Sequence, residues 1–263
     1  MTGFLETISP AYAFSGFVVG FMVGLTGVGG GSLMTPLLIL LFGIAPEKAV
    51  ATDLIYASIT KTGGSLVHQF NRAIDWRIVG RLAAGSLPAA LVTLTTFYFL
   101  GLDSTAVRGL ITRVLGTALY ATALALILRP LLLRLSARFE GLSPESTRTY
   151  TIVTGAVLGV LVSISSVGAG ALGVIALILL YPKAPILRIA ASDIAHAVPL
   201  TLIAGVGHLV GGSINTALLV SLLVGSLPGI MLASAFAPRL PDAALRLILA
   251  ATLILVATKL LFG

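Results

Sequence analysis

The sequence predicts an all-α polytopic membrane protein built from two related halves, and three observations support that prediction. Hydrophobic residues make up 57% of the 263 residues and charged residues only 10%, against roughly 25% charged residues in an average soluble domain. The apolar residues form long runs, most of them close to the roughly 20 residues that one helical crossing needs. Polar and helix-breaking residues also recur in the same order about 140 residues later. Lipid is therefore expected to cover most of the surface.

The expected spans follow the apolar runs in order along the chain. The runs occupy about 11–43, 49–68, 78–100, 109–128, 150–181, 189–208, 216–236 and 243–262. The first and the fifth exceed 30 residues, which is too long for one crossing and short for two. Each of these two contains a cluster of small residues, and each glycine weakens a helix interior by about 1 kcal/mol. We therefore expect a broken or re-entrant helical hairpin in both runs.

The placement of the basic residues favours hairpins over single crossings. A single crossing by every run divides the basic residues eight to seven and gives no orientation. With hairpins, and leaving out Lys61 inside a run, eleven lie on one side and four on the other. The larger group is Arg72, Arg77, Arg81, Arg129, Arg134, Arg138, Arg148, Lys183, Arg188, Arg239 and Arg246, and the smaller is Lys48, Arg108, Arg113 and Lys259. Cytoplasmic loops carry excess Lys and Arg, so we expect the larger group inside and both termini outside.

The duplication divides the chain into a first transmembrane repeat (1–128), a basic cytoplasmic linker (129–149) and a second transmembrane repeat (150–263). The matches are Ala51-Thr52-Asp53 with Ala191-Ser192-Asp193, His68 with His208, and Gly85-Ser86-Leu87-Pro88 with Gly225-Ser226-Leu227-Pro228. With hairpins, the first repeat starts outside and the second inside, so the two repeats would be inverted. Inverted repeats with discontinuous helices are a recurring design of secondary transporters, which bind substrate near the midplane at the repeat interface.

Composition also limits the partners and cofactors that we expect. The net charge of +7 does not indicate nucleic-acid binding, because the basic residues lie in short loops between apolar runs. The chain has no cysteine, so disulfides and thiolate metal sites are excluded. No basic leader precedes the first run, which we interpret as a retained membrane segment. We expect a multi-pass protein of the cell (inner) membrane with no cofactor and no metal, whose partners are the lipid bilayer and a small anionic substrate. A homodimer is compatible with the sequence.

The two glycine clusters are the main candidates for a substrate site. A helix broken inside the membrane exposes free backbone N–H groups at the start of its second half, and these donors attract an anion. Small residues also let helices pack closely, but two matched clusters inside over-long runs favour the anion site. The candidate substrate-binding residues are Thr26, Gly29, Gly30, Gly31, Ser32, Thr52, Lys61, Ser165, Ser166, Gly168, Gly170 and Ser192.

Lys61 is the one basic residue expected deep within a span, and Thr201 stands at the matching place in the second half. A charge inside the membrane is costly and usually faces a cavity or a partner. Lys61 either attracts the anion there or extends its side chain to the inner interface.

Four matched residues are candidates for proton coupling. Asp53 and Asp193 lie about one turn inside symmetric spans, and a buried carboxylate can exchange a proton. The alternatives are a capping role or a salt bridge with a nearby basic residue. His68 and His208 lie at span ends, where a histidine is more often an interfacial hydrogen-bonding group than a proton relay.

Three motifs carry a resemblance to a known family. The segment Gly24–Gly31 has the pattern Gly-x-Thr-Gly-x-Gly-Gly-Gly and is followed by Pro36, then by Ala51-Thr52 and by a passage from His68 to Asp75-Trp76. With these motifs the chain resembles the sulfite exporter TauE/SafE family, also called the toluene sulfonate uptake permease family, over essentially its whole length. The resemblance implies a multi-span carrier of sulfur-containing anions, including sulfite, thiosulfate and organosulfonates.

The chain departs from that family pattern at two kinds of position. Ala169 stands where a fuller second glycine cluster would have glycine. Asp53 and Asp193 follow the Thr and Ser of the matched motif, where a small or neutral residue is expected. The two carboxylates make a proton-linked transport cycle more plausible.

Three classes of function are compared for such a multi-span chain. A secondary carrier of a small sulfur-containing oxyanion, coupled to protons, agrees with the repeats and the midplane polar residues. An intramembrane serine hydrolase would pair Ser165 or Ser166 with His196 or His208, but the first half has no partner for His196. A passive anion channel needs a continuous polar lining. We therefore predict a transporter and no enzyme; the residues alone leave open which anion is carried and in which direction.

Overall fold

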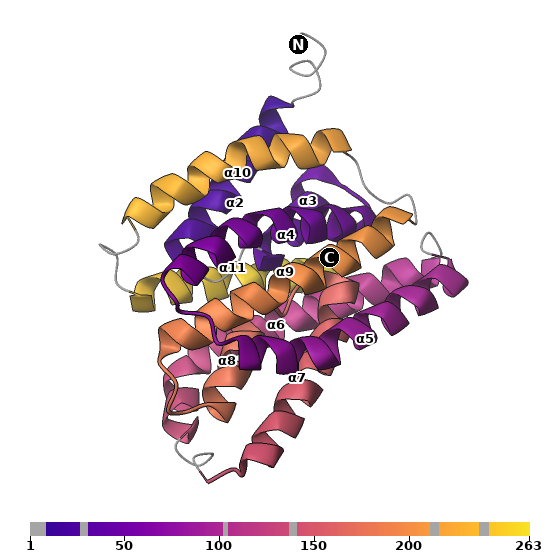
Figure 1. The fold of residues 1–263 in the computed structure, drawn as a ribbon. Helices are drawn as coiled ribbons and strands as arrows, with labels where there is room; N and C mark the ends of the chain where they lie inside the picture. The colour runs from indigo at the N-terminus through magenta and orange to yellow at the C-terminus, as the bar shows by residue number, and fades with distance from the viewer. Residues whose placement is uncertain (1–8, 27–30, 102–104, 137–140, 211–215, 237–241) are drawn as a thin grey trace.

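The computed structural model describes residues 9–26, 31–101, 105–136, 141–210, 216–236 and 242–263. These residues form α-helices and no strand, as the sequence predicts (Figure 1). The helices are α2 (Pro10–Thr26), α3 (Gly31–Phe42), α4 (Pro46–Phe70), α5 (Trp76–Leu100), α6 (Thr105–Leu135), α7 (Pro144–Ser165), α8 (Ala171–Leu180), α9 (Ile186–Val210), α10 (Thr216–Phe236) and α11 (Asp242–Phe262).

Several helices have the length and composition of membrane spans. Within the described residues, five segments are long and apolar enough to cross a bilayer: Trp76–Leu100, Thr105–Ile127, Pro144–Ser165, Ile186–Val210 and Thr216–Ala233. Large apolar side chains lie on the outside of the bundle, among them Phe70, Phe99 and Phe262. So much exposed apolar surface needs a lipid covering, and the chain is a multi-pass membrane protein.

Both over-long apolar runs are interrupted, as predicted. The first is divided between α2 and α3 and the second between α7 and α8. In the second break Ser166 has a φ of 59°, and Gly168 and Gly170 each have a φ of 128°. Glycine adopts such positive φ angles readily because it has no Cβ. The first cluster, residues 27–30 with the candidates Gly29 and Gly30, lies outside the described residues.

The helix order repeats, with α2–α6 in the first half matched by α7–α11 in the second. The closest helix crossings are also duplicated. Helix α5 packs on α7, and their counterparts α10 and α2 pack on each other. In both crossings a Cβ added to a glycine would overlap a backbone carbonyl of the partner helix. The pairs are Gly155 with Leu82, Gly159 with Ser86, Gly16 with Leu222 and Gly20 with Ser226. Small residues let these backbones approach closely, which explains part of the matched pattern.

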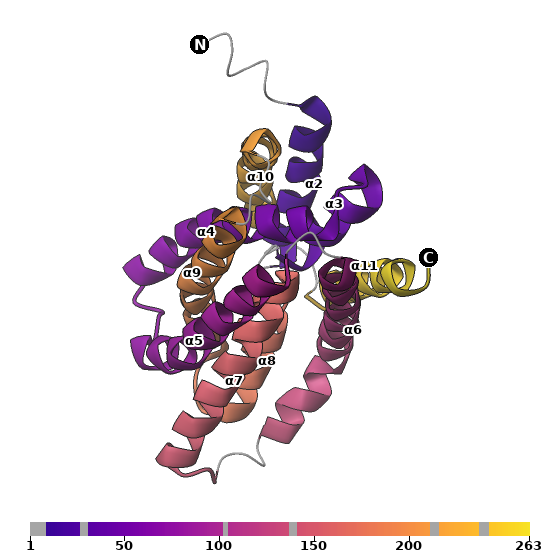
Figure 2. The same ribbon diagram turned by 90° about the vertical axis from the view of Figure 1, so that its right-hand side faces the viewer.

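Two pairs of matched helices run antiparallel. Gly205 of α9 lies against Ile55 of α4, while Gly64 of α4 lies against Ile194 of α9, so the two neighbouring helices point in opposite directions (Figures 1 and 2). Tyr120 of α6 likewise shares a hydrogen bond of 2.6 Å with Thr258 near the end of α11. Antiparallel matched helices are what an inverted duplication requires, and inversion across the membrane stays a prediction.

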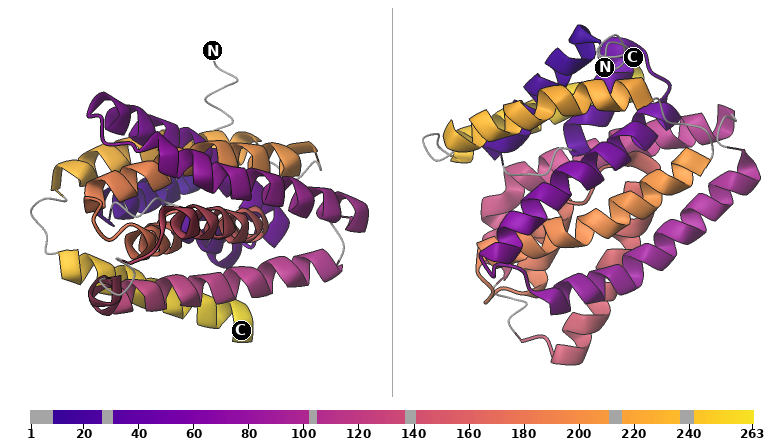
Figure 3. Two further views of the ribbon diagram at one scale, coloured as in Figure 1. Left: turned by 60° about the horizontal axis from the view of Figure 1, so that its bottom comes forward. Right: turned by 45° about the horizontal axis from the view of Figure 1, so that its top comes forward.

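The segment between the halves is more helical than the predicted linker 129–149. Helix α6 continues through Pro130 to Leu135, and α7 begins at Pro144, where the Ser143 hydroxyl accepts a hydrogen bond from the Ser146 N–H. Figure 3 shows both helices extending toward the same end of the molecule. Apolar composition marks the lipid-spanning part of a helix, whereas proline at its first turn and a serine cap set where the helix itself starts.

Candidate functional site

Three charged side chains lie buried inside the bundle on two adjoining helices, and we call Asp53, Lys61 and Asp193 the central charge cluster. Both carboxylates are 0% exposed and Lys61 is 6% exposed. Asp53 and Lys61 lie on one face of α4, and Asp193 lies on the adjoining α9. The Lys61 ammonium interacts electrostatically with Asp193 and with Asp53. One buried cation therefore serves two matched buried carboxylates, which is how charges are usually tolerated inside a membrane protein.

Lys61 reaches the break between α7 and α8. Its Nζ donates a hydrogen bond of 3.1 Å to the carbonyl oxygen of Ala169, one of the carbonyls that the helix break leaves without a partner in the helix. The side chain therefore points into the bundle, and extension toward the interface is not what the structure shows. Of the two interpretations considered for Lys61, the position in the interior agrees with a role at the site.

Asp193 lies beside the start of α8. The N–H of Gly170, the residue before the helix, interacts with the carboxylate, and a Cβ added to Gly173 in the first turn would overlap Asp193 Oδ1. No side chain caps α8 by a hydrogen bond, and within the described residues neither Asp193 oxygen completes one. A helix N-terminus attracts negative charge. The carboxylate thus occupies the place that the sequence analysis expected a substrate oxyanion to take.

Asp53 has the corresponding neighbour in α3. The Thr35 hydroxyl donates a hydrogen bond of 2.6 Å to Asp53 Oδ2. The Ser166 hydroxyl, in the second break, also interacts with this carboxylate, although it completes no hydrogen bond among the described residues. Sequence reasoning missed Thr35, although it follows the candidate Ser32 by three residues and so lies near the same helix end.

The remaining substrate candidates divide into two groups. Thr26 ends α2, and Gly31 and Ser32 begin α3; the structure describes their backbone but not their side chains. The hydroxyls of Thr52 and Ser192 instead bond the carbonyls four residues earlier, at 2.8 and 2.7 Å. The Ser192 hydroxyl also accepts a 2.9 Å hydrogen bond from the N–H of Asp75, which caps α5. These two hydroxyls adjoin the carboxylates in sequence but are engaged with backbone.

Ser165 and Ser166 shape the second break. The Ser165 hydroxyl bonds the carbonyl of Leu161 at 2.7 Å and accepts from the N–H of Val167 at 3.2 Å. Ser166 closes α7 in the left-handed conformation. Together with Gly168 and Gly170 they let the chain leave one helix and begin the next within five residues.

The matched histidines have different surroundings. His208 is fully buried, its Nε2 lies 2.9 Å from the carbonyl oxygen of Ser163, and its ring contacts Phe97 edge-on. This position differs from the expected interfacial one, because the face of α9 that carries His208 packs inside the bundle. His68, in the last turn of α4, is only half-buried.

His196 is paired with Ser86, which sequence reasoning did not predict. Its Nε2 lies 2.7 Å from the Ser86 hydroxyl, and both are buried. In the described part of the chain neither His196 nor His208 bonds Ser165 or Ser166, so no serine–histidine dyad forms there. The matched pair in the other half is Tyr56 and Ser226, which also interact. Each pair joins one repeat to the other.

Comparison with known proteins gives a consistent result. The family model described as "Sulfite exporter TauE/SafE" matches residues 12–260. "Probable membrane transporter protein YjnA" of Bacillus subtilis is 37% identical over 97% of this chain and 100% of its own. YdhB of the same organism is 25% identical over 88% of this chain and 91% of its own, and MJ0441 of Methanocaldococcus jannaschii is 28% identical over 74% and 70%. Both are also named probable membrane transporter proteins. No solved structure matches the chain significantly.

Proposed function

The chain belongs to the sulfite exporter TauE/SafE family of membrane transporters and is not an enzyme, and from that premise we propose that it is a proton-coupled secondary carrier of small sulfur-containing oxyanions in the cell (inner) membrane. The family description and the resemblance at Gly24–Gly31 support sulfite, thiosulfate or an organosulfonate as the substrate. One observation carries the mechanism: a single buried lysine beside a helix break interacts electrostatically with two matched carboxylates.

Charge balance links the proton to the anion. With all three groups ionised, the central charge cluster carries two negative charges and one positive charge. An anion entering this buried site would add to the excess negative charge, and uncompensated buried charge is costly. When both carboxylates are protonated, the Lys61 ammonium is left to balance a monoanion. Proton binding therefore favours anion binding in the same place.

The position of Asp193 supplies a second link. Its carboxylate lies at the start of α8, where the exposed N–H groups attract negative charge. A protonated carboxyl has no net charge and loses most of that attraction. An oxyanion can then replace it at the same donors, with several acceptor oxygens to use. The carboxylate and the substrate compete for one helix end, so in each transport cycle the substrate would take the place of the Asp193 carboxylate and later give it up again.

Alternating access would follow from an inverted duplication. The antiparallel course of α4 and α9 supports a pseudo-two-fold axis in the membrane plane. Such an axis would relate the starts of α3 and α8, so both would face the central charge cluster. We propose that the two halves rock about this cluster and expose it to one side of the membrane at a time.

Flux measurements with two carboxylate variants test the proposal. In proteoliposomes, the natural chain should accumulate labelled sulfite, thiosulfate or a sulfonate when a pH gradient is imposed. Asp193→Asn and Asp53→Asn should each lose this accumulation, because an amide does not exchange the proton, yet retain counterflow exchange. Glu145→Gln, at an exposed carboxylate in the first turn of α7, is the matched control and should behave like the natural chain. Unchanged pH dependence in both aspartate variants would exclude these residues from the coupling.

A further inference from the structure

Arginines converge on a groove between the first turns of α5 and α7. The groove has a volume of about 400 Å³. We call it the basic groove, and its lining residues are Trp76, Arg77, Gly80, Arg81, Ala84, Arg148 and Ile152. Three of the seven are arginines and none is acidic. All three belong to the group of basic residues that the sequence analysis places on the cytoplasmic side.

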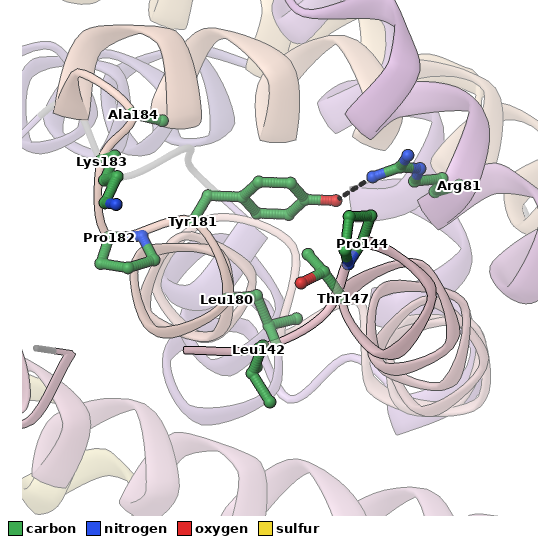
Figure 4. A pocket seen from close by; sticks show the side chains of 9 residues that line it. All are labelled: Arg81, Leu142, Pro144, Thr147, Leu180, Tyr181, Pro182, Lys183 and Ala184. Carbon is green, nitrogen blue, oxygen red and sulfur yellow. Dashed lines mark hydrogen bonds between the residues drawn. The ribbon is translucent and has the colours of Figure 1, made fainter. Parts of the chain in front are cut away.

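Arg81 is held in place by a hydrogen-bond chain. Its Nη1 donates to the Tyr181 hydroxyl at 3.0 Å, and Tyr181 in turn bonds the Thr151 hydroxyl of α7 at 2.8 Å. Figure 4 shows the Tyr181 ring extending across to Arg81, with Lys183 on the far side of a second cavity of about 450 Å³. Arg81 lines both cavities. An arginine fixed in this way loses less side-chain freedom when it binds an anion.

Among the described residues, no carboxylate lies at salt-bridge distance from Arg77, Arg81 or Arg148. Two acidic residues are next to the groove in sequence, and neither lines it. The Asp75 carboxylate caps α5 by accepting from the backbone N–H of Arg77, and Glu145 is exposed. Three guanidinium groups around one small groove therefore leave a local positive charge for a ligand to neutralise, and guanidinium groups bind phosphate through paired hydrogen bonds.

An apolar surface continues from the basic groove along α5. Gly80 and Ala84, which line the groove, and Leu91 further along the helix are exposed, and their spacing places them on one face of the helix. Trp76, at the rim of the groove, is 57% exposed and has the amphipathic character of residues at the headgroup level. A ligand that fits both surfaces has an anionic head and an apolar body.

We propose that the basic groove binds the phosphate of an anionic phospholipid, whose acyl chain lies along the exposed face of α5 formed by Gly80, Ala84 and Leu91. Basic pockets between membrane helices on the cytoplasmic side suit such headgroups. The occupant is a membrane lipid because the groove leads directly onto surface that lipid covers. This site lies apart from the central charge cluster, and its existence does not depend on the transport mechanism.

The matched crossing in the other half shows that packing does not require the arginines. At the places of Arg77, Arg81 and Arg148, the crossing of α10 and α2 has Ala217, Ser221 and Ser9. There the Ser9 N–H donates a 3.1 Å hydrogen bond to the Ser221 hydroxyl. The same backbone crossing is thus made without a charge, so the three arginines add a function that close helix packing does not need.

Native mass spectrometry of the full-length chain tests the proposal with phosphatidylglycerol and phosphatidylcholine as probes. The natural chain should retain phosphatidylglycerol in preference to phosphatidylcholine. Arg81→Gln and Arg148→Gln should each weaken that retention by about fivefold, the effect of removing one basic residue near an anionic headgroup. Arg134→Gln is the matched control, because Arg134 is an exposed arginine of the same predicted side on α6, and it should leave retention unchanged.

Several results would overturn the site. Equal losses in Arg134→Gln would show a diffuse attraction to basic residues, and equal retention of both lipids would show no headgroup recognition. Binding of inorganic phosphate or sulfite that is lost in Arg81→Gln, with lipid retention unchanged, would identify a soluble-anion site instead. The same measurements in an Asp193→Asn background should give the same lipid preference, so a failure of the transport proposal would leave this one standing.

Discussion

The two halves of the molecule have the same packing but different charges. At the crossing of α5 and α7 and at the crossing of α10 and α2, glycines meet backbone carbonyls in the same register. The first crossing ends in arginines that line the basic groove, whereas the second ends in serines that bond each other. The comparison teaches that the duplication accounts for the helix geometry. Direction and specificity have to come from positions where the halves differ.

The central charge cluster shows the same contrast. Asp53 and Asp193 are matched, but Lys61 has only Thr201 as its counterpart. The Thr201 hydroxyl bonds the carbonyl of Ala197 at 2.8 Å and takes no part in the cluster. A symmetric cluster with two lysines would hold an anion strongly and release it slowly. Under the proposed mechanism, a single ammonium shared by two carboxylates would bind an anion only when the carboxylates are protonated, which suits a carrier.

The largest effect is expected from removing the unmatched charge. Lys61→Met keeps most of the side-chain length but leaves two buried carboxylates without a cation. Loss of the partner of a buried charge costs up to about 3–5 kcal/mol when the two ions are in contact, so thermal unfolding in detergent should shift to lower temperature. Thr201→Met, at the matching buried place, is the control for the change in shape and should cost less.

A triple variant sharpens that test. If the loss in Lys61→Met comes from uncompensated charge, then adding Asp53→Asn and Asp193→Asn should recover much of the stability, because no buried charge remains in the cluster. A Lys61→Met protein as stable as the natural chain would show that the ammonium does not compensate these carboxylates.

A smaller effect is expected from the shared packing. Gly159→Ala and Gly20→Ala each introduce a Cβ that overlaps a carbonyl at one of the two matched crossings, and overpacking typically costs about 1–3 kcal/mol. Gly109→Ala is the control, since nothing lies near its added Cβ, and it should stabilise α6 by up to about 1 kcal/mol. The unfolding temperatures of the three variants decide the question. Losses confined to one crossing would show that the halves do not share their packing.

The sequence predicted the helices and both breaks because apolar length and glycine clusters are local signals. The sequence did not predict which side chains of different helices contact each other. Thr35 with Asp53 and Ser86 with His196 each join residues brought together only by the crossing of separate helices. The place of Asp193 beside the start of α8 depends on the direction in which the chain leaves the break. The burial of His208 depends in the same way on which helices pack against α9. Hydropathy along the sequence does not predict those neighbours.

The smallest effect separates a structural hydroxyl from a substrate ligand. Ser192 adjoins Asp193 and was a substrate candidate. Its hydroxyl, however, donates to the carbonyl oxygen of Arg188 and accepts from the N–H of Asp75, the residue that caps α5. Ser192→Ala should therefore cost about 1 kcal/mol of stability, the usual loss of one hydrogen bond, with little change in anion affinity. Ser146→Ala, in an exposed turn, is the control for stability. Isothermal titration with sulfite and thermal unfolding measure the two quantities separately.

If Ser192→Ala instead lowered the affinity by tenfold or more at unchanged stability, its hydroxyl would face the substrate during part of the cycle. The site would then include the matched positions 52 and 192 as well as the carboxylates, and within the site Lys61 would be the one charge without a counterpart in the other half.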